Sequence, residues 1–473
     1  MLKGNAPRGL IDDVADFAER AVKTGLADRR ENAVRAVLDT VGNMALGAAQ
    51  PIHGLVSEVA RQWGTGDAAT AIGHPHRMPS TAAAFVNGTL AHCMDFDDTH
   101  LPSVLHPSAS VVPAAFAAGE AGEADGPRLL DAITVGIEVC VRLGMAGYDA
   151  QLGNSIFFER GQHATAICGA VGSAVAAAML ATGGAGTIAA AASIAASMGS
   201  GLLEANRTGG SVKRIHTGWA AHCGVAAAQL AACGLTGPPT VLEGRFGFFT
   251  AFCGEGARPE LVTEDLGDHW YSDAMHIKPY PSNHFTHAGI DAALELRSRG
   301  VTPEDVVAVE LGLPAPVLRT VAEPADVKAS PESGYAAAFS GPYTVAAALV
   351  GGGGLGLYID DFTDEAARRP EVLALARKVT CYADPDCTAL FPGQFPARVT
   401  AHLTEGRTEE VIRHTNRGGP HLPLTEGELR RKFTLNATRS FDGRSVELLA
   451  SEIQRLADTA SARSVMKLLR IPG

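Results

Sequence analysis

The densest group of side chains that could carry chemistry lies in one short stretch of the chain. It contains, in order, Asp95, Asp97, Asp98, His106 and Ser108. Aspartate and histidine supply oxygen and nitrogen ligands, so a metal centre is one interpretation. Adjacent aspartates cannot easily face one ion from a helix, however, and no second group of ligands follows. An acidic helix end that leads into a loop, and a site that works without a metal, are the other interpretations.

His106 lies just before two prolines that are typical of a helix start. Pro107 suits the first turn of a helix, and Pro113 predicts that the helix begins or kinks in this region. The positive end of the helix dipole favours the neutral form of a nearby imidazole, and a general base must be neutral. The backbone N–H groups of the first turn also bind carboxylates. His106 is therefore a candidate base, and a histidine that only caps or packs the helix is the alternative.

His163 stands directly before a long segment without charge. Residues 164–203 contain no Asp, Glu, Lys or Arg and are rich in Ala, Gly and Ser. An imidazolium is poorly solvated beside such a segment, so we expect His163 to be neutral. A core histidine with one hydrogen bond is the alternative. The segment is long enough for a transmembrane hairpin, but small residues gain little from lipid, so it predicts buried helices instead.

Two further groups bring positive charge. Lys213 and Arg214 follow a pair of glycines, and arginine can hold a carboxylate through two parallel hydrogen bonds while lysine acts as a point charge or proton donor. An ordinary solvated basic turn is the alternative.

Residues 278–287 bring a lysine and two histidines to the start of a predicted helix, at a change of sequence texture. Ligand clefts often form at such domain junctions.

The elements that must position these residues are mostly helices. Apolar residues recur at helical spacing in 34–41 and 56–63, and this character continues to about residue 267. Beyond it, the patterns predict a helix at 286–299, strands at 306–311, 398–403 and 409–413, and helices from 426 to 469. The sequence therefore predicts a mainly α fold. A large all-helical domain is expected from residues 1–267 and 414–473, and a smaller α+β lid domain from residues 268–413.

Composition limits the class of protein. The 473 residues are 46% hydrophobic and carry a formal net charge of -12, which predicts a large core and disfavours nucleic acid or a membrane as a partner. The eight cysteines form no Cys-x-x-Cys pair and lack the spacing of a zinc or iron-sulfur site, so buried free thiols are expected. The first twenty residues lack the apolar core of a signal peptide. We therefore expect a cytoplasmic protein.

Taken in order, six motifs resemble those of the MmgE/PrpD family, whose members include 2-methylcitrate dehydratase, cis-aconitate decarboxylase and iminodisuccinate epimerase. The match runs nearly end to end, and its motifs lie at residues 87–98, 106–108, 161–165, 212–218, 278–281 and 338–343. The resemblance implies a helical domain built from both ends of the chain, with an α+β lid domain between them. It also implies a homodimer and the use of no metal or organic cofactor.

The resemblance further implies which residues line the pocket. Those expected to carry catalysis are Asp95, His106, His163, Lys213 and Tyr343. Those expected to bind substrate are Arg214, Lys278, Asn283, His284 and Ser108. The decarboxylase branch has a histidine where Asn283 stands here, with His284 beside it. This departure weakens the decarboxylase interpretation in particular.

The reactions of the family share a carbanion beside a carboxylate, which forms only where cations or N–H groups already face it. We therefore expect a metal-independent lyase, dehydratase-like, that acts on a small polycarboxylic acid such as 2-methylcitrate. Lys213 and Arg214 would hold carboxylates, and His106 or His163 would remove the α-proton. Tyr343 or the other histidine would protonate the departing hydroxyl. An epimerase or racemase, a decarboxylase of a related acid and a non-catalytic carboxylate-binding helical dimer are the alternatives.

Overall fold

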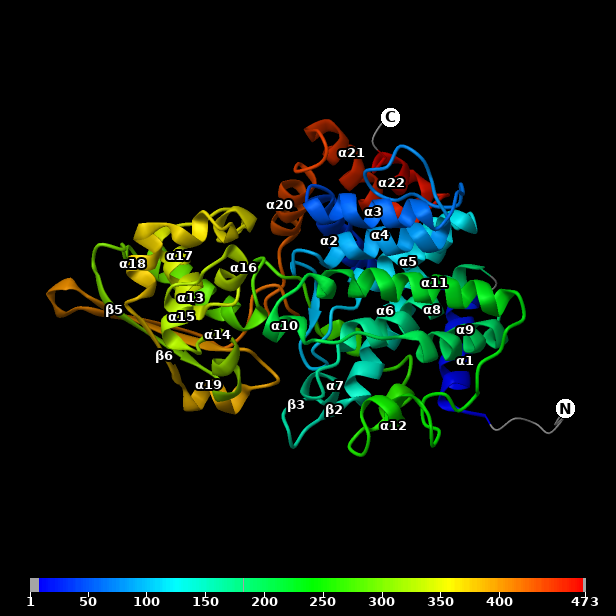
Figure 1. Cartoon of the computed structure of the whole chain (residues 1–473), viewed down its shortest axis with the longest axis horizontal. Helices are drawn as coiled ribbons and strands as arrows, with labels where there is room; N and C mark the ends of the chain where they lie inside the picture. The colour runs from blue at the N-terminus through cyan, green and yellow to red at the C-terminus, as the bar shows by residue number, and fades with distance from the viewer. Residues whose placement is uncertain (1–7, 182, 471–473) are drawn as a thin grey trace. The chain divides into compact units, whose positions relative to one another are not determined.

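The computed structural model describes residues 8–181 and 183–470, and it is mainly helical, as the sequence predicts. Contacts within the chain divide it into two compact units (Figure 1). Unit 1 contains Met1–Met275 and Phe433–Gly473, and unit 2 contains His276–Lys432. Both boundaries fall later in the sequence than the expected ones, after residues 267 and 413.

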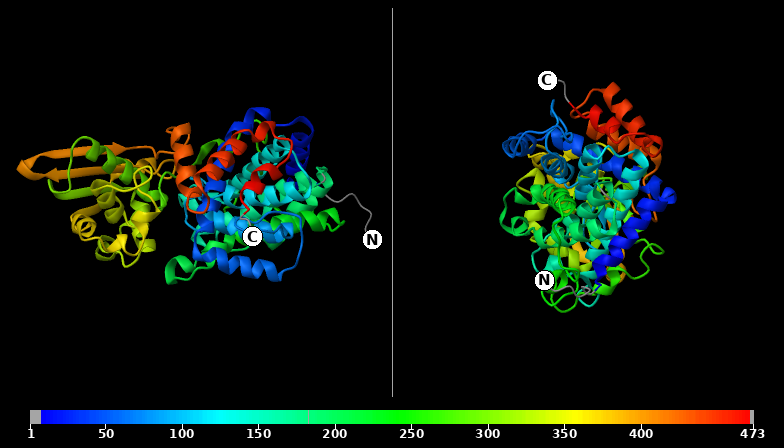
Figure 2. Two further views of the ribbon diagram at one scale, coloured as in Figure 1. Left: turned by 90° about the horizontal axis from the view of Figure 1, so that it is seen from above. Right: turned by 90° about the vertical axis from the view of Figure 1, so that its right-hand side faces the viewer.

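Unit 1 is a group of helices packed around α8 (Ala164–Ala181). The helices that pack against it include α5 (Ser108–Ala121), α6 (Gly126–Ala146), α9 (Ala185–Met198) and α11 (His216–Ala232). Other helices of the unit are α1 (Leu10–Thr24), α2 (Arg30–Ala48), α3 (Pro51–Gln62), α4 (Ser80–His92), α7 (Ile156–Glu159), α10 (Ala205–Thr208), α12 (Phe248–Phe252), α21 (Gly443–Gln454) and α22 (Arg463–Leu468). Helix α2 contacts α21, and Figure 2 shows the N-terminal helices, in blue, beside the C-terminal helices, in red.

Helix α8 is apolar along its length and is buried in unit 1. Among residues 8–181 and 183–470 it is the one helix long and apolar enough to cross a membrane, and 94% of it is buried inside the protein. Its small residues allow close packing, since a Cβ on Gly172 would overlap the carbonyl oxygen of Gly136 in α6. The charge-free stretch thus forms two helices packed on each other, α8 and α9, as the sequence predicts.

A second close contact joins α4 to α11. Gly88 of α4 lies against Gly218 of α11, and the Thr217 hydroxyl donates to the Gly88 carbonyl oxygen at 2.8 Å. His92 is the last residue of α4, and His216 is the first residue of α11. Both histidines therefore lie within about one helical turn of this contact, which holds them in place.

Gly218→Ala is expected to lower the free energy of unfolding by about 1–3 kcal/mol, because the new methyl group overpacks the crossing of α4 and α11. It would overlap the hydroxyl oxygen of Thr89 and the carbonyl oxygen of Phe85. Gly186→Ala in α9 is the matched control, since a Cβ there meets nothing within 4 Å. Urea unfolding followed by circular dichroism compares the two variants. Equal stability of both would contradict the close contact.

Unit 2 contains a four-stranded sheet with the order β6-β5-β7-β8. Its strands are β5 (Val306–Leu313), β6 (Val379–Ala383), β7 (Ala397–Leu403) and β8 (Thr408–Arg413). Strand β5 is parallel to β6 and antiparallel to β7, and β7 is antiparallel to β8. Val309 pairs with Ala401 and Leu311 pairs with Val399, so alternate residues of these strands enter the core.

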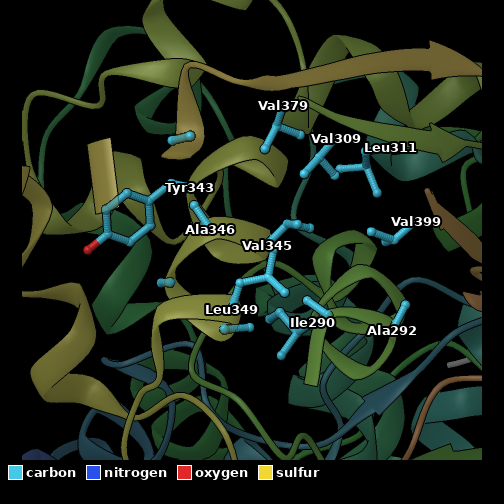
Figure 3. Packing of buried hydrophobic residues seen from close by; sticks show 14 of the residues in the cluster. Ile290, Ala292, Val309, Leu311, Tyr343, Val345, Ala346, Leu349, Val379 and Val399 are labelled. Carbon is cyan, nitrogen blue, oxygen red and sulfur yellow. The ribbon is translucent and has the colours of Figure 1, made fainter. Parts of the chain in front are cut away.

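Helices α13 (His287–Ser298) and α17 (Gly341–Val350) pack on each other and on the strands of this sheet. Figure 3 shows Ile290 of α13 and Val345 of α17 among the buried side chains that include Leu311. The shorter helices of unit 2 are α14 (Leu318–Val321), α15 (Ala325–Ala329), α16 (Gly334–Ala337), α18 (Pro370–Ala376) and α19 (Pro385–Leu390). The two-residue strands of the chain are β1 (Thr99–His100), β2 (Tyr148–Asp149), β3 (Asn154–Ser155) and β4 (Met275–His276).

The helix and the three strands predicted for the smaller domain are confirmed, with small shifts at their ends. Strand β6 was not predicted, because it is short, lies at the edge of the sheet and buries little beyond Val379. The C-terminal region is helical as expected but is divided into α20 (Glu426–Ala437), α21 and α22. The side chain of Asp442 accepts a hydrogen bond from the Ser445 N–H at 3.0 Å, and this cap marks the new start at α21.

Candidate active site

Four histidines from separate segments of unit 1 converge, and we call them the imidazole cluster: His92, His106, His163 and His216. The ring centroid of His92 lies 5.3 Å from that of His106 and 5.7 Å from that of His163. The rings of His163 and His216 are 5.1 Å apart. His106 is half-buried, and the other three are buried. His92 ends α4 and His216 begins α11, while His106 and His163 lie just before α5 and α8.

His106 has a fixed tautomer. Its Nδ1 lies 2.7 Å from the carbonyl oxygen of Asp98, and a carbonyl oxygen only accepts, so Nδ1 carries the proton. The neutral ring therefore carries its lone pair on Nε2. The backbone N–H of His106 also donates to the hydroxyl oxygen of Thr165 at 3.2 Å, which anchors the residue to α8. A neutral imidazole with an oriented Nε2 has the properties of a general base.

Asp95 and Lys213 lie next to this base. Oδ1 of Asp95 is 3.9 Å from Nε2 of His106, and Oδ2 of Asp95 is 4.0 Å from Nζ of Lys213. Asp95 has a φ of 52°, a left-handed conformation that aspartate tolerates better than most residues. Lys213 belongs to the 3-10 turn Val212–Ile215, which leads directly into α11. A cation and a carboxylate thus stand within 4 Å of each other beside the base.

His163 and His216 form a pair. Their Nδ1 atoms are 3.0 Å apart, so one ring donates to the other. Burial lowers the pKa of His163 well below its usual value, and the Lys213 ammonium lowers it further. Burial also lowers the pKa of His216, to about 4, with contributions from His92 and Lys213. Both rings are therefore neutral near pH 7, as expected for His163 from the sequence.

His92 pairs with Asp97. Nδ1 of His92 lies 2.8 Å from Oδ2 of Asp97, and both side chains are buried. With Asp95 they form the one group of three potential metal ligands among the described residues, with one atom from each within 4.8 Å of the others. Because Asp97 already accepts a hydrogen bond from His92, two of these three groups bind each other. The geometry fits a hydrogen-bonded pair, and the absence of a metal requirement stays a prediction.

Asp98 holds the loop that carries His106. Ser108 is fully buried, and its hydroxyl donates to Oδ2 of Asp98, while the Ser108 N–H lies 3.4 Å from Oδ1. Burial raises the pKa of Asp98 to about 8, so this side chain is largely protonated at pH 7. The structure therefore shows Ser108 bound to Asp98, and its predicted contact with substrate stays a prediction.

Asp98→Asn is expected to become more stable relative to the wild type as the pH rises from about 4 to 8. The folded protein keeps a proton on Asp98 up to about pH 8, whereas an ordinary aspartate, with a pKa near 3.8, releases it. The favourable contribution of Asp98 to the free energy of unfolding is therefore complete at low pH. It falls by about 1.4 kcal/mol for each pH unit across this window. Asparagine resembles the protonated acid and does not titrate. Urea unfolding at a series of pH values measures the difference, and parallel curves would contradict it.

The remaining predicted site residues lie in unit 2, apart from Arg214, which is exposed beside Lys213. Asn283 caps the 3-10 turn His284–Thr286 by accepting a hydrogen bond from the Phe285 N–H at 3.0 Å. The ring of His284 stacks on that of His287 at 4.5 Å. Lys278 is buried. Their predicted roles in binding substrate stay predictions.

Tyr343 is part of the core of unit 2, and Figure 3 shows it among the other buried residues. Its hydroxyl donates to the carbonyl oxygen of Asp361 at 2.8 Å. Burial raises the pKa of Tyr343 to about 12, so its proton is harder to release than that of an exposed tyrosine. This environment does not favour an acid, and the catalytic role of Tyr343 stays a prediction.

The geometry thus brings together four of the five residues expected to carry catalysis, Asp95, His106, His163 and Lys213. Two family models match the chain, the MmgE/PrpD N-terminal domain over residues 12–260 and the MmgE/PrpD C-terminal domain over residues 280–457. The chain belongs to the MmgE/PrpD family. The resemblance seen in the sequence is confirmed, and unit 1 of this MmgE/PrpD chain holds the imidazole cluster.

Curated relatives of this MmgE/PrpD protein match over almost their whole length. Cis-aconitate decarboxylase of Mus musculus is 30% identical over 447 residues, which cover 93% of this chain and 88% of the relative. The enzyme of the same name from Homo sapiens is 30% identical over 470 residues, covering 96% and 94%. That of Aspergillus terreus is 28% identical over 495 residues, covering 99% and 97%. A lyase reaction on small polycarboxylates is therefore the chemistry of these relatives.

Two members of the imidazole cluster were not predicted as site residues. His92 and His216 lie within motifs that resemble the family, but the sequence alone indicates no role for either residue. Both lie close to a glycine that makes a tight helix contact, His92 after Gly88 and His216 before Gly218. A histidine near such a glycine at a helix end is the sequence signal that could have drawn attention to them.

Proposed function

We propose that this chain is a lyase that forms a carbanion beside a carboxylate of a small polycarboxylate, without a metal or organic cofactor. The observation that carries the proposal is the fixed tautomer of His106, whose Nε2 lies 3.9 Å from Asp95, which in turn lies 4.0 Å from Lys213. A base and a cation beside each other are what such a carbanion needs, because the charge moves onto carboxylate oxygens as the proton or carbon dioxide leaves.

Decarboxylation of cis-aconitate or a close analogue is the first candidate reaction. The relatives are named for that activity, and they align with this chain over nearly their whole length. The bond between carbon and one carboxylate breaks, its electron pair stays on the carbon, and carbon dioxide leaves. Lys213 would neutralise a remaining carboxylate. A protonated member of the imidazole cluster would then supply a proton to the carbon.

Dehydration of a 2-methylcitrate-like hydroxy acid is the second candidate, and Asn283 favours it. This residue stands where the decarboxylase branch has a histidine, and here it serves as a helix cap. In this reaction Nε2 of His106 removes the α-proton, and the hydroxide leaves as water once a second group protonates it. His163 is the group in unit 1 best placed to do so, since its ring lies close to that of His92 beside His106.

Proton NMR in deuterated water tests the proposal, with cis-aconitate, 2-methylcitrate and citrate supplied separately to the chain in the presence of EDTA. Decarboxylation is expected to release carbon dioxide and to place one deuterium on the product. Dehydration gives an alkene without carbon dioxide, and an epimerase exchanges the α-proton without losing either group. A non-catalytic binding protein leaves every substrate hydrogen in place. Turnover that EDTA abolishes would contradict the metal-independent chemistry.

We further propose that the chain forms a homodimer through the exposed face of α3. Leu55, Val59 and Trp63 are exposed and follow one another every four residues, which places them on one side of the helix and its end. An exposed apolar strip of this kind favours a protein contact. Sedimentation equilibrium is expected to give twice the 48.9 kDa chain mass, and a monomer at all concentrations would contradict it.

A cytoplasmic location is also proposed. Within residues 8–181 and 183–470 the cysteines are all free, and only Cys233 among them is exposed. Free thiols are typical of a reducing compartment. Fractionation of the source cells, with the chain detected by antibody, tests this, and recovery in a secreted fraction would contradict it.

A further inference from the structure

The backbone of Gly201 packs against the contact between His163 and His216. The N–H of His163 donates to the Gly201 carbonyl oxygen at 3.0 Å. A Cβ on Gly201 would lie 3.1 Å from Cβ of His163 and 3.3 Å from Nδ1 of His216. The two rings are therefore packed at a distance that lets them share one hydrogen bond, and little space remains for either ring to turn away.

A contact between two Nδ1 atoms restricts how the pair holds its protons. Since the atoms are 3.0 Å apart, one of them carries a hydrogen and the other accepts it. When His163 is the donor, its Nε2 is bare and basic. When His216 is the donor, Nε2 of His163 carries the hydrogen instead. In both arrangements Nδ1 of His163 is occupied, so Nε2 is the atom that can meet a reactant.

We propose that His216 is a positioning residue that takes over the Nδ1 proton of His163 when His163 accepts a proton at Nε2, so that the positive charge of the pair moves onto His216. This inference rests on the proposed function and goes beyond it, because it gives a role to a residue outside the reacting groups. A proton from solvent bonds to Nε2 of His163, and the Nδ1 proton passes to Nδ1 of His216. His163 is then neutral again, and His216 is an imidazolium.

The reverse transfer completes the cycle. His216 returns the proton to Nδ1 of His163, and Nε2 of His163 gives its proton to the leaving hydroxide or to the product carbon. The pair regains this proton from solvent before the next turnover, and His106 releases the α-proton to solvent. For a decarboxylation, the cycle begins from the singly protonated pair, which delivers its proton to carbon and regains one from solvent before the next turnover.

The Nδ1 contact is the path by which a proton, and with it the charge, passes between the two rings. Both rings are buried, and burial is the largest cause of the lowered pKa of each. The charged and titratable groups around the pair include His92 from α4, His106 before α5 and Lys213 from the turn before α11. The carboxylates of Asp97 and Asp95 lie against His92 and Lys213 in turn. Because the Lys213 ammonium lowers the pKa of both rings, an anionic substrate bound at Lys213 would favour the protonated pair.

His216→Asn is the test variant, because the asparagine amide stands near the place of Nδ1 and keeps a hydrogen bond without being able to gain a proton. Turnover of the full chain is expected to fall about 10- to 100-fold, less than the 10²- to 10⁴-fold expected for a direct proton carrier. KM is expected to stay near its wild-type value. The fall in kcat should be larger at low pH than at high pH, since the variant has lost the site that stores the proton.

His222→Asn is the matched control, as this histidine lies on the same helix, is half-buried and has its Nδ1 3.1 Å from the Thr81 carbonyl oxygen. It is expected to keep wild-type kcat and the wild-type pH profile. A His216→Asn chain with unchanged kcat, or with the same fractional loss at every pH, would overturn the inference. Loss of turnover in His222→Asn to the same extent would also overturn it.

Nitrogen-15 NMR of the resting chain, labelled at histidine, provides a measurement that needs no substrate. One Nδ1 of the pair is expected to carry a proton and the other to lack one, with a coupling between them that His216→Asn removes. Two protonated or two bare Nδ1 atoms would overturn the inference. If the wild type turns over no candidate acid, the proposed function fails. If it turns over normally and the pair shows no shared proton, the inference about His216 fails alone.

Discussion

Replacing His106 with asparagine is expected to lower kcat by about 10²- to 10⁴-fold, because the base at Nε2 is lost. Asparagine places an amide N–H near the position of Nδ1, so the hydrogen bond to the Asp98 carbonyl oxygen, 2.7 Å in the wild type, can be kept. The loop and the fold are therefore expected to survive the change. Initial rates with the best substrate from the NMR screen, together with circular dichroism, measure both quantities.

His53→Gln is the control for the loss of an imidazole in unit 1. Nε2 of His53 lies 3.1 Å from the Ile72 carbonyl oxygen, and a glutamine amide can replace that contact. This variant is expected to retain wild-type kcat. Near-wild-type kcat in His106→Asn would remove His106 as the base and would transfer that role to His163, the other predicted base of the cluster.

Much of the site could be predicted because its residues carry chemistry that their types reveal. Asp95, His106 and Lys213 were expected together, and the structure places Asp95 within 4.0 Å of both partners. The neutral state expected for His163 follows from the apolar sequence after it, and burial is indeed the largest cause of its lowered pKa. Residue type and local polarity were sufficient for these predictions.

The other half of the cluster could not be predicted from spacing. His92 and His216 are far apart in the sequence, and they meet the other rings because Gly88 and Gly218 let α4 and α11 approach closely. Residues that come near one another through a tertiary contact leave no periodic pattern. Asn283 was expected in the pocket from the family resemblance; the structure shows it capping a turn, and its role in binding substrate stays a prediction.

For the helices and strands too, features set by the local sequence pattern could be predicted, and features set by tertiary contacts could not. The regular elements of unit 2 could be predicted from period-two and period-3.6 patterns, such as β5, where Val309 and Leu311 alternate into the core. Strand β6 could not, because an edge strand with one well-buried residue gives almost no alternation. The unit boundaries depend on contacts between distant segments, and these fell later than the change of sequence texture.

Lys213→Met is expected to lower kcat/KM by about 10²- to 10³-fold, the range for losing one group that stabilises developing negative charge. The same change should raise the pKa of both His163 and His216, because the Lys213 ammonium lowers both in the wild type. The acid side of the pH–rate profile is therefore expected to move to higher pH. Lys213→Arg keeps the charge and should recover part of the activity. Lys23→Met, at an exposed pair with Glu19, should change nothing.

A double variant, Asp95→Asn with Lys213→Met, separates two possible roles of the Lys213 ammonium. Oδ2 of Asp95 lies 4.0 Å from the Lys213 ammonium, so Lys213→Met also removes a positively charged neighbour of Asp95. If neutralising Asp95 were the whole role of Lys213, Asp95→Asn combined with Lys213→Met would recover kcat/KM. We expect no such recovery, because the substrate carboxylate still lacks its cation. Recovery in the double variant would assign Lys213 to Asp95 alone and would leave the carbanion without the charge that the proposed lyase chemistry requires.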